Sequence, residues 1–344
     1  MNSANRQIAI WLFSGCFLIF VMVVVGGITR LTGSGLSITE WKPIMGTIPP
    51  LNEAEWNTAF EKYKQIPQFQ KINYHFNLAD FKSIFWWEFI HRLIGRLIGV
   101  VFIIPFLYFF IKKKFEKNTS RKMLLLFLLG GLQGFLGWFM VSSGLAERTS
   151  VSHIRLAIHL ITAFITFAFT FYFALELWYS EREKSNLIHS KLRSLNKLIF
   201  FVLILQIVYG ALVAGLHAGK MHNTFPLMSG QIIPNGMGVM EPTIVNIFDN
   251  PVTVQFIHRL IAFTLIFLCT WLFVSSKKEK LEKFQKAGLK WLMIALTIQF
   301  LLGVLTLLTQ VNIVLASVHQ IGAFFLFSVS IYLLYSFRKN SASV

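Results

Sequence analysis

Phe89-Ile90-His91-Arg92-Leu93-Ile94 is a short stretch that returns later in the chain as Phe256-Ile257-His258-Arg259-Leu260-Ile261. Each copy opens a long apolar run, over residues 87–111 and 252–274 respectively. A bilayer core about 30 Å thick is crossed by a helix of about 20 apolar residues. The repeated stretch therefore predicts two equivalent membrane-spanning helices in different halves of the chain.

The rest of the chain carries further runs of this kind, at residues 8–28, 123–141, 154–178, 197–216, 288–310 and 314–336. The first run lacks a small-residue cleavage site, so we expect it to be a retained span and no signal peptide. The chain has 344 residues, of which 55% are hydrophobic and 14% charged, and its mean hydropathy is +0.62. Soluble domains average about 25% charged residues. The sequence predicts an all-α, polytopic membrane protein with eight transmembrane helices.

The basic residues cluster in alternate connections between the expected spans. They are Lys112, Lys113, Lys114, Lys117, Arg121, Lys122, Arg182, Lys184, Lys191, Arg193, Lys277, Lys278, Lys280, Lys283, Lys286, Arg338 and Lys339. Lys and Arg are enriched in loops on the inner side of a membrane. Both termini are therefore expected inside, in the cytoplasm of a bacterium at its inner membrane or in the matrix at a mitochondrial inner membrane. The net charge of +17 is then an orientation signal among membrane lipids, with no nucleic-acid partner.

Three elements recur in the same order in each half of the chain. The copies are 89–94 and 256–261, Gln133 with Gly137 and Gln299 with Gly303, and the His-x-x-x-Ala-Phe stretches that begin at His159 and at His319. Repeats of this kind indicate repeated supersecondary units. We expect two pseudo-symmetric four-helix bundles, formed by residues 1–190, with a long outer segment at 29–85, and by residues 191–344.

Four histidines, His91, His159, His258 and His319, fall one in each even-numbered span. Counting helical rise from the outer boundary places all four roughly 7–12 Å deep. Two imidazoles on facing helices suit the two axial positions of a haem iron, whereas zinc requires three or four ligands. We expect His91 to pair with His159 and His258 to pair with His319 at two haem sites. The alternative is a set of hydrogen-bonded core histidines.

Arginines and small residues accompany these histidines. Arg92 and Arg259 directly follow their histidines and are expected to bind haem propionates, because an arginine within a membrane is costly unless it is paired. Their alternative is to extend to the outer interface. A second group fits a flat macrocycle and equally fits ordinary helix packing: Gly95, Gly99, Gly137 and Gly303.

The two halves differ chemically three residues before their first histidine. Glu88 precedes His91, and Gln255 precedes His258. A carboxylate can accept a proton during a reaction, and an amide cannot. The first half is therefore expected to be reactive and the second to hold a fixed redox cofactor, with capping of the helix start as the alternative role of Glu88. The outer segment 29–85 is expected to be either a lid over the first site or an interfacial anchor.

Taken together, these motifs resemble those of the haem A synthase family in its proteobacterial and mitochondrial form. The stretches that carry the resemblance are 27–37, 41–43, 88–96, 133–138, 155–159, 223–228, 255–259 and 319–320. The resemblance covers nearly the whole chain. One departure is that Gram-positive relatives carry a cysteine pair in the first outer segment, while this chain has only Cys16 and Cys269, both within spans.

The resemblance implies an oxidoreductase that converts a ring methyl of haem O into a formyl group by successive hydroxylations, with water as the oxygen source. It implies that His258 and His319 hold a haem b cofactor, that His91 and His159 flank the substrate haem, and that Glu88 serves in catalysis. It also implies work beside the farnesyltransferase that makes haem O (haem O synthase). Our hypothesis is that Glu88 accepts a proton while electrons leave through the second haem; assembly as a homo-oligomer stays open.

Two other functions compete with this interpretation. A bis-histidine cytochrome b electron carrier fits the ligand pairs, but a relay across the bilayer needs haems near both faces, and all four histidines are expected near one. A transporter with two related halves is the other alternative. Transporter sites lie near the midplane and often use broken helices, and the even-numbered spans lack interior helix breakers around their histidines.

Overall fold

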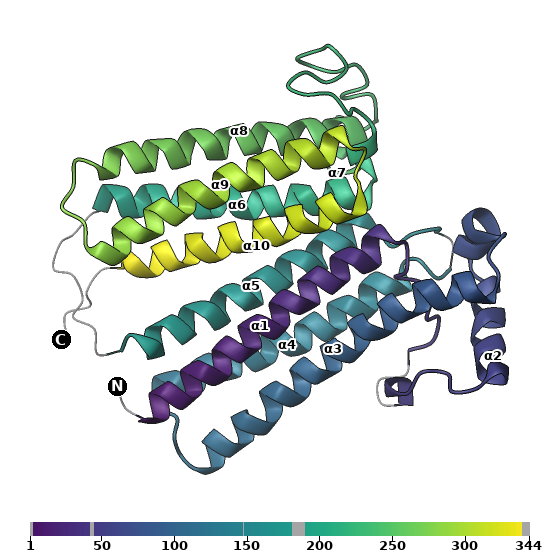
Figure 1. The fold of residues 1–344 in the computed structure, drawn as a ribbon, viewed down its shortest axis with the longest axis horizontal. Coiled ribbons are helices and arrows are strands. Elements are labelled where there is room, and N and C mark those ends of the chain that lie inside the picture. The colour runs from purple at the N-terminus through teal and green to yellow at the C-terminus, as the bar shows by residue number, and fades with distance from the viewer. Residues whose placement is uncertain (1–2, 42–44, 147, 181–189, 339–344) are drawn as a thin grey trace. The chain divides into compact units, whose positions relative to one another are not determined.

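Within the described residues, 3–41, 45–146, 148–180 and 190–338, the computed structural model is helical and contains no strand beyond one isolated bridge (Figure 1). Eight of its helices are long and apolar enough to cross a membrane. They are α1 (Ser3–Leu31), α3 (Leu78–Ile111), α4 (Lys117–Ser142), α5 (His153–Trp178), α6 (Ser190–Gly215), α8 (Pro251–Ser276), α9 (Lys283–Leu308) and α10 (Ile313–Ser336). The predicted all-α class with eight spans is confirmed. Lys42, Pro43, Arg182, Lys184 and Lys339 lie outside the described residues.

Counted along the chain, the second, fourth, sixth and eighth spans are α3, α5, α8 and α10. Asparagine caps set the starts of three of these even-numbered spans. Asn77 before α3 accepts hydrogen bonds from the backbone of Ala79 (2.8 Å) and Asp80 (3.1 Å). Asn250 before α8 and Asn312 before α10 likewise accept from the first turn of the helix that follows. An asparagine oxygen satisfies backbone N–H groups that have no partner within the helix. The three caps fix where three of the four histidine-bearing helices begin.

Helix α3 begins at Leu78, earlier than the apolar run that predicted it at residue 87. The Asp80 carboxylate accepts from the Asn77 backbone N–H (3.0 Å) and completes a capping box. Phe81 and Phe85, in the extra turns, are buried against helix α2 (Glu53–Lys64). The additional turns are stable because they pack against the outer segment, a contact that hydropathy alone does not report.

The chain divides into two compact units, one formed by residues 15–166 and the other by residues 1–14 with 167–344. In the second of these units, α6 packs against α8, α8 against α9, α9 against α10, and α10 against α6. The end of α5 belongs to the same unit, where the Phe167 and Phe324 rings lie 4.2 Å apart. The expected halves 1–190 and 191–344, and their arrangement as two pseudo-symmetric bundles, stay predictions.

The outer segment of the first unit is a folded structure with its own apolar core. It contains a 3-10 turn (Met45–Thr47), α2 and a π turn (Phe69–Asn73). Helix α2 buries Trp56, Phe60 and Tyr63, whose spacing places them on one helix face. These side chains pack with Leu36 and with the first turns of α3. The segment that follows α6 is built of shorter elements, the 3-10 turns Ala218–Lys220 and Thr243–Val245 and the single-turn α7 (Asn246–Asp249).

Candidate functional site

In the first unit, each of the two predicted histidines lies against a glycine of the neighbouring odd-numbered span. A Cβ atom built on Gly26 of α1 would lie 3.0 Å from His91 Nε2, on α3. A Cβ on Gly137 of α4 would lie 3.2 Å from His159 Cε1, on α5. Cβ contacts this short are tighter than ordinary van der Waals packing. Because glycine has no Cβ atom, each imidazole can occupy this space.

The second unit repeats this arrangement. A Cβ on Gly210 of α6 would lie 3.3 Å from His258 Cε1, on α8, and one on Gly303 of α9 would lie 2.9 Å from His319 Cε1, on α10. The four glycines that were expected to accompany the histidines differ in what they face. Gly137 and Gly303 face histidine rings, whereas a Cβ on Gly95 would meet Met22 and one on Gly99 would meet nothing within 4 Å.

The structure brings the predicted histidines together in pairs within one unit. His91 and His159 are close enough to interact electrostatically, and so are His258 and His319. Among the described residues no three histidine, cysteine, aspartate or glutamate side chains gather into a metal centre. Each donor set therefore offers two imidazoles, as an iron already held by a porphyrin requires. That the histidines are iron ligands stays a prediction.

Glutamine amides lie against three of the four imidazoles. Gln133 Nε2 is 3.1 Å from His159 Nδ1 and also donates to the His159 carbonyl (3.0 Å). Gln206 Nε2 is 3.3 Å from His258 Nε2, and Gln299 Nε2 is 3.4 Å from His319 Nε2. The amides hold their rings from the odd-numbered spans.

The sequence interpretation had found Gln133 and Gln299 but missed Gln206, Gly26 and Gly210. The missed signal is the spacing Gln-x-x-x-Gly, which occurs at Gln206 and Gly210 as it does in α4 and α9. Residues four apart lie one helical turn apart on the same face. In α1 the corresponding position, four residues before Gly26, is Met22, so this part of the pattern is absent from the first span.

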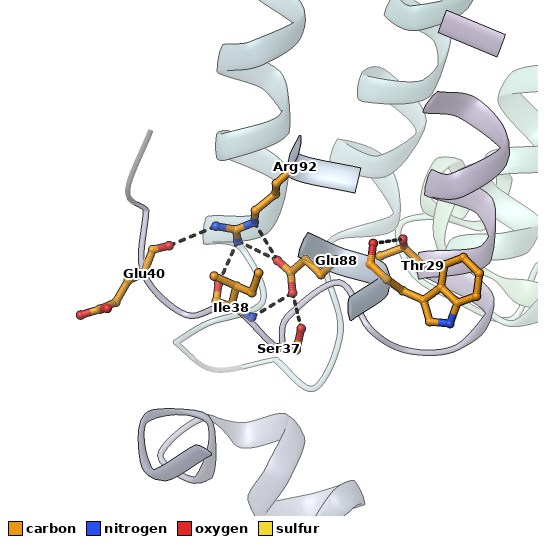
Figure 2. Close-up of polar contacts among 7 residues, drawn as sticks. Thr29, Ser37, Ile38, Glu40, Glu88 and Arg92 are labelled. Atoms are coloured by element: carbon orange, nitrogen blue, oxygen red, sulfur yellow. Dashed lines mark hydrogen bonds and ion pairs between the residues drawn. The ribbon is translucent and has the colours of Figure 1, made fainter. Parts of the chain in front are cut away.

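Glu88 is the most enclosed acidic side chain at these sites, with 3% of its surface exposed. Figure 2 shows its carboxylate between α3 and the stretch that follows α1. Oε2 accepts hydrogen bonds from the Ser37 hydroxyl (2.7 Å) and the Ile38 backbone N–H (2.9 Å). Oε1 accepts from Arg92 Nη2 (2.7 Å) and Nε (3.1 Å). The bonds from Arg92 form an ion pair, and charge-assisted bonds of this kind are stronger than those between neutral groups.

Arg92 extends the same network to the backbone of the outer segment. Its Nη2 donates to the Ile38 carbonyl (2.8 Å) and its Nη1 to the Glu40 carbonyl (3.0 Å) (Figure 2). Nearby, Thr29 Oγ1 donates to the carbonyls of Val25 (2.8 Å) and Trp87 (3.3 Å). Arg92 and Glu88 together fasten residues 37–40 to α3. The predicted contact of Arg92 with a propionate stays untested.

A matching clamp is built in the second unit from neutral and basic groups. Gln255 Nε2 donates to the His222 carbonyl (3.0 Å). Arg259 donates to the same carbonyl through Nη2 (2.7 Å) and to the Thr224 carbonyl through Nη1 (2.9 Å). Each unit thus ties an outer segment to the turn before its first histidine. Only the first unit does so with a carboxylate.

The clamp on residues 37–40 is continuous with the folded part of the outer segment. Gln68 Nε2 donates to the Gly33 carbonyl (2.9 Å), and Gln68 Oε1 accepts from the Tyr63 hydroxyl (3.0 Å). Asn73 Nδ2 in turn donates to Tyr63 Oη (2.7 Å). Burial raises the pKa of the Tyr63 phenol above its ordinary value, and the negative charge of Glu88 adds to the rise. A lid or an anchor, the two expectations for this segment, would each need such fixed attachment.

Arg155, on α5 one turn before His159, binds the end of α4. Its Nη1 donates to the Phe139 carbonyl (2.8 Å) and to the Ser142 hydroxyl (3.3 Å), and the guanidinium lies 3.8 Å from the Phe139 ring centroid. A cation near the carbonyls that end a helix is favourable. Arg155 therefore joins the two helices that carry Gly137 and His159.

The residues present fit a haem at each histidine pair. Both donor sets are two partly buried imidazoles from different helices, and the glycines leave space at the rings. Several polar atoms in the second unit are buried without a hydrogen-bond partner among the described residues: His258 Nδ1, His319 Nδ1, Gln206 Oε1 and Gln299 Oε1. Buried polar groups are normally satisfied. Unpaired donors and acceptors clustered at the rings are typical of a site made for a bound group.

Two further histidines, His217 and His222, belong to the second outer segment. His217 adopts a left-handed backbone conformation (φ 53°) directly before the Ala218–Lys220 turn. His222 Nδ1 lies 2.9 Å from Ser229 Oγ. His222 contributes to the second site through its carbonyl, which accepts from Gln255 and Arg259. Its ring is occupied within the outer segment.

Comparison with known proteins assigns the chain to a family. The family described as cytochrome oxidase assembly protein (COX15-CtaA) matches residues 9–331. A haem A synthase of Flavobacterium johnsoniae is 47% identical over 343 residues, covering 98% of this chain and 100% of that protein. A haem A synthase of Flavobacterium psychrophilum is 50% identical over 339 residues, covering 97% and 99%. One of Nitrosomonas eutropha is 46% identical over 331 residues, covering 95% and 93%.

The matched region includes six spans in full, most of α1 and of α10, both histidine pairs and both outer segments. The repeated histidines, the glycines beneath them and the paired clamps thus lie in a chain that its relatives match over nearly their full length. This chain belongs to the cytochrome oxidase assembly protein family.

Proposed function

We propose that this chain is a haem A synthase, an oxidoreductase of haem A biosynthesis that acts on haem O. The observation that carries the proposal is the likeness, over nearly the full length of both chains, to bacterial proteins named haem A synthase. The paired imidazoles and the difference between Glu88 and Gln255 support it, because they give two related sites with different chemistry.

The proposed reaction converts a ring methyl of haem O into a formyl group with water as the oxygen source. In the first hydroxylation the methyl loses one C–H bond and gains a C–O bond to water, and two electrons and two protons are released. A second hydroxylation of the same carbon releases two more of each. Loss of water from the resulting diol leaves the formyl group. The protein must therefore accept protons beside the methyl and pass electrons to a one-electron acceptor.

The first unit is the proposed substrate site. His91 and His159 would flank the haem O iron, and Glu88, three residues before His91, would accept a proton released from the methyl. The Glu88 carboxylate accepts four hydrogen bonds, two of them from Arg92, which fill the acceptor positions of its two oxygens. Glu88 can therefore gain a proton only when the contacts with Ser37, Ile38 or Arg92 loosen. Proton acceptance would then be coupled to the position of residues 37–40.

The second unit is the proposed cofactor site. His258 and His319 would hold a haem b, with Arg259 beside it, as Arg92 would lie beside the substrate. A haem b bound there would supply the one-electron redox chemistry for removing the electrons. Gln255 replaces the carboxylate at this site, and its amide donates to the His222 carbonyl. An uncharged residue suits a site where no proton is exchanged.

The proposed location is the bacterial inner membrane, with both termini in the cytoplasm, or the mitochondrial inner membrane in a eukaryote. The eight apolar helices and the bacterial relatives support membrane insertion and the bacterial setting. The proposed partners are haem O as substrate and the haem O synthase that supplies it.

The proposal is tested in a host that makes haem O but no haem A. Membranes that contain the wild-type chain are expected to yield haem A when their haems are extracted and identified by mass spectrometry. Glu88→Gln is expected to retain bound haem but to lower haem A yield at least about a hundredfold, the typical contribution of a general base.

Glu61→Gln is the matched control, since Glu61 lies exposed on α2 and pairs with the exposed Lys64; it should leave the yield unchanged. Normal haem A production by Glu88→Gln would refute the role of this carboxylate. Wild-type membranes that contain haem b and unconverted haem O, but no formyl product, would instead favour the bis-histidine cytochrome b carrier.

A further inference from the structure

The second outer segment, residues 216–250 between α6 and α8, exposes many apolar side chains. They include Leu227, Ile232, Ile233, Val239, Met240 and Ile244, of which Ile232 is 79% exposed and Val239 71%. The segment carries only three charged side chains, Lys220, Glu241 and Asp249, whereas α2 of the first outer segment alone carries five. Apolar residues concentrated on one exposed part of a protein mark an interaction site.

The asparagines of the same segment are turned inward. Asn246 and Asn250 are only 2% and 3% exposed. Asn246 Nδ2 donates to the Met240 carbonyl (2.7 Å), and its Oδ1 accepts from the Met240 backbone N–H (3.0 Å). Asn250 Nδ2 donates to the Gly236 carbonyl (2.8 Å). Buried amides beneath exposed isoleucines are the reverse of a surface that faces water, and backbone groups near lipid need internal partners of this kind.

One part of the segment lies against the apolar length of α8. The Phe225 ring stacks on Phe263 of α8 (6.2 Å between centroids) and meets Phe300 of α9 edge-on (5.9 Å). Phe263 comes about three helical turns after Pro251, the first residue of α8. Because residues five apart are about 140° apart around a helix, Phe263 points to a different side of α8 from His258. The segment is thus attached to α8 away from the histidine site.

The side of α8 that contacts Phe225 is apolar and exposed. Leu260, Phe263 and Phe267 lie on one helix face, and all three are exposed. Since α8 is long and apolar enough to cross a membrane, this face meets lipid. Figure 1 shows the loops of the second outer segment (green) extending sideways past α8, across the direction of the helix. The exposed isoleucines therefore belong to a segment that lies beside a lipid-facing surface.

We propose that residues 227–244 insert into the membrane leaflet that surrounds the start of α8. Their ligand is uncharged and apolar, the lipid acyl chains at the boundary with the headgroups. Between residues 221 and 250 there is no lysine or arginine to attract anionic lipid, so insertion is driven by buried apolar area. Residues 222–224, whose carbonyls accept from Gln255 and Arg259, lead into the inserted stretch. Lipid contact thus steadies the stretch that the second clamp holds.

Spin labels test the insertion in the full-length chain, purified and placed in nanodiscs of phosphatidylcholine. Ile232→Cys and Val239→Cys supply attachment sites, since the native Cys16 and Cys269 are buried. Electron paramagnetic resonance compares how often each nitroxide collides with oxygen, which concentrates in lipid, and with a nickel chelate, which stays in water. Both labels are expected about 5–10 Å below the headgroups, the depth of interfacial apolar side chains.

Phe267→Cys on α8 is the lipid-facing control, and Glu61→Cys on α2 is the water-facing control. Labels at positions 232 and 239 that collide with the nickel chelate as often as the Glu61→Cys label would overturn the proposal. Labels that are immobilised and shielded from both reagents would also overturn it, and would assign the surface to a second copy or another protein. Either position decides if the other variant fails to fold. The measurement requires no turnover, so its result is independent of the proposed haem A synthase activity.

Discussion

At the residue scale, each histidine depends on a glycine of a neighbouring helix that has no side chain. The imidazoles of His91, His159, His258 and His319 occupy the space that a side chain would fill at Gly26, Gly137, Gly210 and Gly303. Because the histidine and its glycine come from different helices, each contact also sets how closely two helices approach. A histidine in this protein is therefore positioned by the helix that it faces as much as by its own.

Gly303→Ala tests this dependence. The new Cβ would lie 2.9 Å from His319 Cε1, and overpacking of this kind typically costs about 1–3 kcal/mol. We expect a lower melting temperature and weaker haem retention, measured by thermal unfolding and by the absorbance of purified protein. Gly99→Ala is the matched control because nothing lies within 4 Å of its new Cβ. Equal losses in the two variants would show that the His319 contact is unimportant.

At the scale of elements, each clamp joins an outer segment to the turn that precedes a histidine. Glu88 and Arg92 hold residues 37–40, and Gln255 and Arg259 hold the carbonyls of residues 222–224. The two clamps differ in charge. The first pairs the Glu88 carboxylate with the Arg92 guanidinium, whereas the Gln255 contact of the second is a hydrogen bond between uncharged groups.

The stability of the first outer segment should depend on pH through the Tyr63 phenol. Its folded-state pKa is raised, so above pH 10 the unfolded segment loses this proton before the folded one does. Stability is then fully present below the ordinary tyrosine pKa and falls as pH rises through it. We expect Trp56, which is buried in the same apolar cluster as Tyr63, to show a fluorescence change that begins above pH 10.

Tyr63→Phe removes the titrating phenol and should abolish this onset. It also removes hydrogen bonds with Gln68 and Asn73, so the variant is expected to be less stable by about 1 kcal/mol at neutral pH. An unchanged fluorescence onset in Tyr63→Phe would assign the transition to another group.

The elements that the sequence predicted best are those whose cause lies within one segment. The eight spans follow from local apolar length, and the repeat around His91 and His258 follows from identical letters. Hydropathy placed the start of α3 too late. The burial of Phe81 and Phe85 depends on contacts with α2, a separate amphipathic helix of low hydropathy. The extra turns are a tertiary effect that a local apolar count does not contain.

The residues of the site could likewise be predicted only in part from the sequence. The histidines and the contrast between Glu88 and Gln255 could be found by comparing the halves. Gln206 was missed because its helix precedes the repeated stretch and shares only the Gln-x-x-x-Gly spacing. The partners of Arg92 and Arg259 could not be predicted, because a guanidinium near a membrane surface has propionates, water and carbonyls as alternative partners, and only the folded outer segments place carbonyls within reach.

At the scale of the whole molecule, one helical pattern is used twice with different chemistry at corresponding positions. In each unit the histidines come from two even-numbered spans and rest on glycines of odd-numbered spans. The first unit adds a carboxylate and lacks one amide, and the second has two amides and no carboxylate at this position. The account thus assigns conversion to the first unit and a permanent cofactor to the second.

The most direct test of this account is electron paramagnetic resonance of the oxidised, purified protein and its histidine variants. A low-spin signal of two axial imidazoles is expected in the wild type, with loss of the haem b component in His258→Ala and in His319→Ala. The signal should persist in His222→Ala, whose ring contacts Ser229. A low-spin haem b signal that survives both the His258 and the His319 substitution would contradict the account.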